Sequence, residues 1–158
     1  MARPPKTRPR TASRVAAVQA LFQSEQAGDN PETVIAQFVR HRLGDLEGQD
    51  GFEDGRIPDA EVVLFGRVVR EAVRRQTTID PMLAESLPDD WPLGRIDPVL
   101  RALLRAGVAE LAMTDGPPAK VVINEYLDIA RGFFKGPEPG LAKAVLDRLA
   151  RVLRASEF

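Results

Sequence analysis

The 158-residue chain contains no cysteine, which excludes disulfides, thiolate zinc sites and cysteine nucleophiles. It has a single histidine, His41, so a metal site built from several histidines is excluded as well. No apolar run approaches the roughly 18 residues that a membrane-spanning helix needs. These absences favour a cytoplasmic protein without a membrane anchor, and they leave few residue types for catalysis.

Motifs for phosphate binding or catalysis are also scarce. Neither of the common glycine-rich phosphate loops occurs. Three glycines fall within residues 132–140, but Pro137 and Pro139 lack the backbone N–H groups that a phosphate cradle needs. His41 lies between two arginines late in a predicted helix, and we interpret it as a partner of the helix dipole. The sequence therefore gives no support for an enzyme, and no cofactor is expected.

The net charge of −1 conceals an uneven distribution of charge. Residues 1–14 carry five basic groups and no acidic one, whereas residues 29–61 carry nine acidic groups and three arginines. Because surface charges act over roughly 8 to 10 Å in salt, a local patch can attract an anion although the chain is nearly neutral. The start of the chain is thus either an anion-binding arm or an ordinary solvated tail, and the charge pattern alone favours neither.

Apolar residues recur at helical spacing along most of the chain, and no stretch alternates β-branched with polar residues as a strand would. We predict helices over about 11–27 and 31–44, from a cap at Asp59 to 73, and over about 80–87, 97–113, 122–133 and 141–152. The prediction is an all-α protein of about seven helices, packed as one compact bundle or as two abutting subdomains. We treat 1–158 as one domain, with a flexible basic arm over 1–10 and a mobile acidic loop over 45–58.

Several short motifs follow one another in a distinctive order. In chain order they are Arg14 followed by AVQALF at 17–22, Leu104-Arg105, Glu110-Leu111, KVVINE at 120–125 and AVLD at 144–147. Together they resemble the NusB family of bacterial transcription antitermination factors over nearly the whole chain, residues 45–58 excepted. The resemblance implies an all-α RNA-binding protein.

The chain departs from the family pattern at three places. Phe22 and Ala109 stand where the family usually has tyrosine or a similar residue, so phenolic hydrogen bonds are lost there. Residues 141–144 read Leu-Ala-Lys-Ala where the family commonly has Phe-Val-Asn-Gly. This change removes an aromatic ring that could stack on a base and adds the cation of Lys143.

The resemblance also implies partners. Similar proteins pair with a ribosomal small-subunit protein (NusE), bind the boxA element of nascent RNA, and help RNA polymerase read through terminators, notably on ribosomal RNA operons. Arginine suits RNA contacts because its planar guanidinium stacks on bases and forks onto phosphates. We expect RNA contacts from Arg3, Lys6, Arg8, Arg10, Arg14, Lys120 and Lys143, and partner contacts from Phe22, Arg101 and Arg105. Whether the free protein forms a homodimer stays open.

Two other functions stay open at this point. One is the RNA-targeting helical domain of a ribosomal RNA cytosine methyltransferase, although this chain has no cysteine and no catalytic domain. The other is a helical protein-interaction module without an RNA role, in which the basic arm is an ordinary tail.

Some residues are expected to serve the fold alone. We predict that Leu104 and Val145 are buried between the C-terminal helices and that Trp91 anchors apolar packing. For Asn124 and Glu125 we favour a structural role over RNA contact, because a carboxylate repels phosphate and the KVVINE motif falls in an apolar helix face.

Overall fold

The computed structural model describes residues 9–41 and 61–158, and within these ranges the chain forms seven α-helices and one 3-10 turn, with no strand. They are α1 (Pro9–Ala27), α2 (Pro31–His41), α3 (Val62–Arg74), α4 (Gln76–Ser86), α5 (Pro98–Leu111), α6 (Ala119–Phe133), α7 (Glu138–Leu153) and η2 (Ala155–Glu157). The predicted all-α fold of about seven helices is confirmed. In the described ranges, no helix has an apolar stretch sufficient to cross a bilayer.

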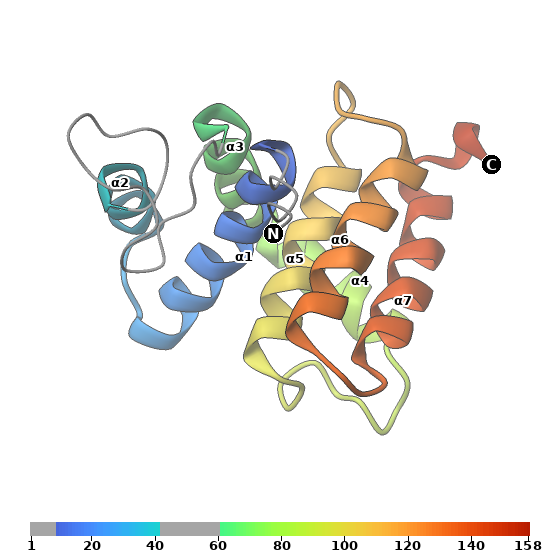
Figure 1. Ribbon diagram of the computed structural model, residues 1–158. Coiled ribbons are helices and arrows are strands. Elements are labelled where there is room, and N and C mark those ends of the chain that lie inside the picture. The colour runs from blue at the N-terminus through green and yellow to red at the C-terminus, as the bar shows by residue number, and fades with distance from the viewer. Residues whose placement is uncertain (1–8, 42–60) are drawn as a thin grey trace, which may run out of the picture.

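The helices fall into two groups that abut in space. In Figure 1, α1, α2 and α3 lie on the left and α4 to α7 on the right. Helix α5 connects the groups because it contacts α1 and α3 on one side and α4, α6 and α7 on the other. Ten of its fourteen residues are buried. At Gly107 an added Cβ would lie 3.0 Å from Leu146 of α7, so this glycine permits the close approach of the two helices.

Local signals account for several helix boundaries. The Asp97 carboxylate accepts a hydrogen bond from the Val99 N–H (2.8 Å), and Pro98 occupies the first turn of α5, where its missing N–H needs no partner. Gly28, with φ at 69°, follows the end of α1. The predicted cap at Asp59 and the last residues of the predicted 31–44 helix lie outside the described residues.

Four helices begin earlier than predicted, among them α6, which begins at Ala119 and not at residue 122. Helix α1 begins at Pro9, so Pro9 and Arg10 belong to its first turn and not to the expected arm. Helix α7 begins at Glu138, three residues early, because Pro139 falls in the first turn, where proline is tolerated. Helix α4 begins at Gln76, directly after α3. The rest of the arm, residues 1–8, and the loop over 45–58 lie outside the described residues.

The core forms where the apolar periodicity predicts it. Leu104 of α5 and Val145 of α7 are buried, as expected. Trp91, in the turn before α5, is half-buried and packs against the core, which confirms its predicted anchoring role. Phe38 of α2 stacks on Phe65 of α3 at a centroid distance of 5.7 Å and so joins these two helices.

Candidate functional site

Arg14, in the second turn of α1, points into the protein. Its side chain is only 1% exposed and forks onto the carboxylate of Glu110 in α5, with Nε–Oε1 at 2.8 Å and Nη2–Oε2 at 2.6 Å. The expectation that Arg14 is accessible to RNA is therefore wrong. Helix α1 is rich in alanine and packs closely on its neighbours, and position 14 falls on the face that meets α5.

The pair belongs to a larger buried network. The Tyr126 hydroxyl of α6 donates to Glu110 Oε1 (2.9 Å), and Arg14 Nη1 lies 3.4 Å from Glu125 Oε1. The Thr11 hydroxyl donates to Glu125 Oε2 (2.9 Å). Burial raises the pKa of Tyr126 well above its ordinary value, and the charge of Glu110 raises it further, so the hydroxyl stays a neutral donor. The network ties the start of α1 to α5 and α6.

The KVVINE motif divides between core and surface. Glu125 takes the structural role expected of it, through Thr11 and Arg14. Asn124 is exposed, so the expectation that it lies in a packed face is wrong. Ile123 and Tyr126 turn toward the core, and the helical rotation puts position 124 on the outer side of α6.

Arg101 and Arg105 of α5 form a second charged cluster, nearer the surface. Both side chains are 12% exposed, and both pair with Glu25 in the last turns of α1. Arg105 also forks onto Asp80 of α4, with both N–O distances at 2.9 Å. Hydrogen bonds from Arg101 hold the pKa of Glu25 below its usual range. These arginines join α1, α4 and α5, and their contact with a partner stays a prediction.

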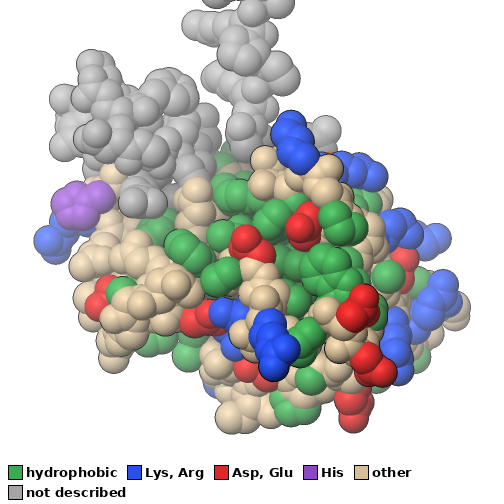
Figure 2. Space-filling model, turned by 90° about the horizontal axis from the view of Figure 1, so that it is seen from below, with side chains coloured by type: hydrophobic (Ala, Val, Ile, Leu, Met, Phe, Trp, Pro, Cys, Tyr) green, Lys and Arg blue, Asp and Glu red, His purple; other side chains and the backbone are tan. Residues whose placement is uncertain are grey.

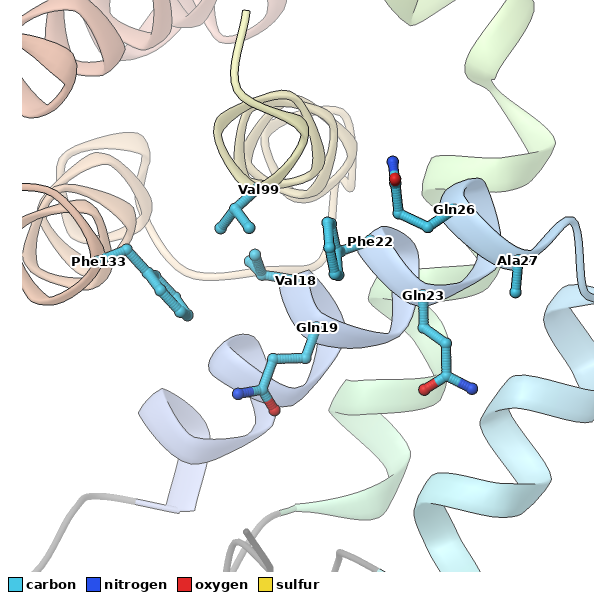
Figure 3. A pocket seen from close by; sticks show the side chains of 8 residues that line it. All are labelled: Val18, Gln19, Phe22, Gln23, Gln26, Ala27, Val99 and Phe133. Atoms are coloured by element: carbon cyan, nitrogen blue, oxygen red, sulfur yellow. The ribbon is translucent and has the colours of Figure 1, made fainter.

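An apolar groove of about 420 Å³ opens beside the last turns of α1. In Figure 3, Val18 and Val99 lie between two aromatic side chains, Phe22 on one side and Phe133 on the other. Phe22 is half-buried against the core, whereas Phe133, at the end of α6, is 41% exposed. An exposed apolar hollow between two aromatic rings is typical of a protein-docking surface.

Gln19 lines the same groove and has an unusual polar atom. Its side-chain carbonyl oxygen is buried, and the described part of the chain provides no hydrogen-bond donor for it. A buried acceptor without a donor is costly, and a donor brought by a partner would satisfy it.

The remaining predicted RNA contacts lie apart from the groove lining. Arg10 is 60% exposed, with its Nε 3.4 Å from Glu61 Oε2. Lys120 is exposed in the first turn of α6, and Lys143 is exposed on α7, with Asp147 at 2.8 Å. Arg3, Lys6 and Arg8 lie outside the described residues.

The face seen in Figure 2 is not uniformly basic over the described residues. In Figure 2, hydrophobic side chains gather in the middle of the visible face, and acidic and basic side chains lie among and around them. A binding surface on this face would therefore combine apolar contact with local charge.

Comparisons with known proteins agree with this fold. A family model described as the NusB family matches residues 11–151. A protein from Granulibacter bethesdensis, named transcription antitermination protein NusB, is 69% identical over 153 residues, which cover 97% of this chain and 94% of that protein. A protein of the same name from Rhodopseudomonas palustris is 44% identical over 154 residues, covering 97% and 88% of the two chains.

Two solved structures have similar folds. T. maritima NusB has a TM-score of 0.71 at 26% identity and covers 93% of each chain. A chain in a structure described as antitermination factors NusB and NusE in complex with double-stranded RNA has a TM-score of 0.70 at 21% identity, covering 90% of this chain and 96% of that one. The fold and the relatives define the class as all-α transcription antitermination factors. The chain belongs to the NusB family.

Proposed function

We propose that this chain acts in the cytoplasm as a non-catalytic antitermination factor. It pairs with a NusE-type ribosomal protein, binds boxA-type single-stranded RNA, and promotes read-through by RNA polymerase, notably on ribosomal RNA operons. The observation that carries the proposal is the close relationship to proteins named transcription antitermination protein NusB over almost their whole length. The relationship favours this function over a methyltransferase domain and over an interaction module without an RNA role.

The groove of Figure 3 is the proposed contact surface for the ribosomal protein. Phe22 forms one wall, and the exposed ring of Phe133 gives the partner an aromatic contact of the kind that dominates interface energetics. Arg101 and Arg105 are mostly covered and internally paired. They act at this surface by fixing, through Glu25, the turns of α1 that carry the groove lining.

RNA binding is proposed for the exposed cations. Arg10 follows three further basic residues of the N-terminal stretch, Arg3, Lys6 and Arg8, and these cations together can neutralise several phosphates. Lys120 and Lys143 are proposed as additional phosphate contacts. Arg14 does not belong to this set, because Glu110 neutralises it inside the protein.

The proposed partner surface can be tested with two aromatic residues of similar exposure. Phe133 is 41% exposed at the groove, and Phe158 is 47% exposed at the C-terminus. We expect Phe133→Asp to abolish assembly with the NusE-type protein, measured by calorimetric titration, and Phe158→Asp to leave the affinity unchanged. Equal affinities of wild type and Phe133→Asp would remove the groove from the interface.

A further inference from the structure

A second, smaller hollow lies where the start of α1 meets α3 and the turn after α5. Its volume is about 100 Å³, roughly a quarter of that of the apolar groove. The hollow is lined by side chains from three elements. Helix α1 contributes Arg10, α3 and its N-cap contribute Glu61, Leu64 and Arg67, and the turn contributes Met113 and Asp115. We call it the base pocket.

Two arginines at the base pocket lie next to carboxylates. Arg67 Nη2 donates to Asp115 Oδ1 at 2.8 Å, and Arg10 Nε lies 3.4 Å from Glu61 Oε2. All four side chains remain at least 44% exposed, so each retains free hydrogen-bonding capacity toward a ligand. Leu64 and Met113 add apolar surface between the charged groups.

This combination selects the chemistry of a ligand. Two carboxylates next to the arginines disfavour a phosphate, and the arginines disfavour a metal ion. A flat, neutral group with both donors and acceptors matches the lining, because guanidinium groups donate to ring nitrogens and carbonyl oxygens while carboxylates accept from amino groups. A nucleobase has these properties and a size suited to a hollow of this volume.

We propose that the base pocket receives one unstacked nucleobase of the bound RNA, and that this base carries an exocyclic amino group. The proposal rests on the proposed RNA-binding function and assigns a specificity-determining site to it. Glu61 and Asp115 accept from the amino group, Arg67 donates to a ring or carbonyl acceptor, and Leu64 and Met113 contact the base. Uracil fits worse because it has no amino group to donate.

The test combines a protein variant with an RNA variant. Arg67→Gln removes a pocket cation, and Arg70→Gln is the matched control because Arg70 lies one turn further on α3, is similarly exposed and is also paired with a carboxylate, Glu32. The RNAs are boxA-type oligonucleotides, each with one abasic position. Each is titrated against the complex that the ribosomal protein forms with wild type, Arg67→Gln or Arg70→Gln.

We expect one position at which the abasic change weakens wild-type binding by roughly 5- to 150-fold, the range for one stacked base. The same abasic change should weaken RNA binding by Arg67→Gln much less, and it should weaken binding by Arg70→Gln as much as it weakens wild-type binding. At that position, wild type should bind an amino-bearing base more tightly than uracil. Because Arg67 touches a base and not a phosphate, Arg67→Gln should leave the salt dependence of affinity unchanged.

Several results would overturn the base pocket. One is an abasic scan that is identical in wild type and Arg67→Gln, and another is an equal effect of Arg70→Gln. A shallower salt dependence for Arg67→Gln would make Arg67 a phosphate contact instead. If RNA with uracil at the identified position binds as tightly as RNA with an amino-bearing base there, Glu61 and Asp115 do not accept from the base. Failure of the wild-type complex to bind any RNA would refute the proposed function itself, so the two failures are distinguishable.

Discussion

Replacing Arg14 by methionine tests the buried network most severely. The change removes the cation but keeps a side chain of similar length, so Glu110 is left buried with a negative charge. Within the described residues, its remaining side-chain donor is the Tyr126 hydroxyl. Removing one partner of a buried ion pair costs about 3 to 5 kcal/mol, because the other charge stays desolvated. The free energy of unfolding of a typical domain is about 5 to 15 kcal/mol, so this loss is a large part of the total.

The assay is urea unfolding followed by circular dichroism, with Arg10→Met as the control. With a slope of roughly 2 kcal/mol per molar urea, the Arg14→Met midpoint should fall by about 1.5 to 2.5 M. Arg10 is on the surface, so its change should cost at most about 1 kcal/mol. The double variant Arg14→Met, Glu110→Gln should recover part of the loss because it also removes the stranded charge. Equal midpoints for Arg14→Met and Arg10→Met would refute the network.

Three further predictions concern stability. Truncating the buried Leu104 to alanine should cost about 2 to 5 kcal/mol, seen as a lower urea midpoint; an unchanged midpoint would show that the α5 register is wrong. Arg154 donates to the carbonyls of Leu111 and Met113, both at 2.7 Å, so Arg154→Ala should cost about 1 to 3 kcal/mol, and exposed Arg148→Ala should cost almost nothing. Tyr126 is the only tyrosine, and its pKa is raised in the folded protein. The neutral hydroxyl therefore contributes its full stabilisation below pH 10.0, the ordinary pKa. This stabilisation is lost as the pH rises above 10.0 toward the folded-state pKa. Tyrosinate absorbance should therefore appear only together with unfolding, reported by Trp91 fluorescence, and ionisation near pH 10.0 in the folded protein would contradict the burial.

The sequence predicts the helices well because helix formation follows local periodicity. In α5 the apolar positions Leu100, Leu103, Leu104 and Leu111 identify the buried face, and Asp97 with Pro98 marks its start. In α7 the same reasoning places the start too late, because a first-turn proline is permitted in a helix and also typical of a loop.

The candidate site is harder to predict because its contacts join distant parts of the chain. Arg14 finds its partner 96 positions away, and an arginine close to a basic tail gives no local sign of burial. The KVVINE motif indicates one packed face, yet of its polar pair Asn124 and Glu125 only Glu125 turns inward. The groove combines Phe22, Val99 and Phe133 from three helices, and no single helical pattern reveals that these side chains meet.

The most direct test of the central claim is a filter-binding titration with boxA RNA and with a scrambled RNA, each with and without the NusE-type ribosomal protein. The account predicts weak binding of both RNAs by the chain alone, because phosphate attraction does not depend on sequence. With the partner present, boxA RNA should bind at least tenfold more tightly than the scrambled RNA, a difference of about 1.4 kcal/mol. Equal affinity for the two RNAs in the presence of the partner would contradict the proposed function.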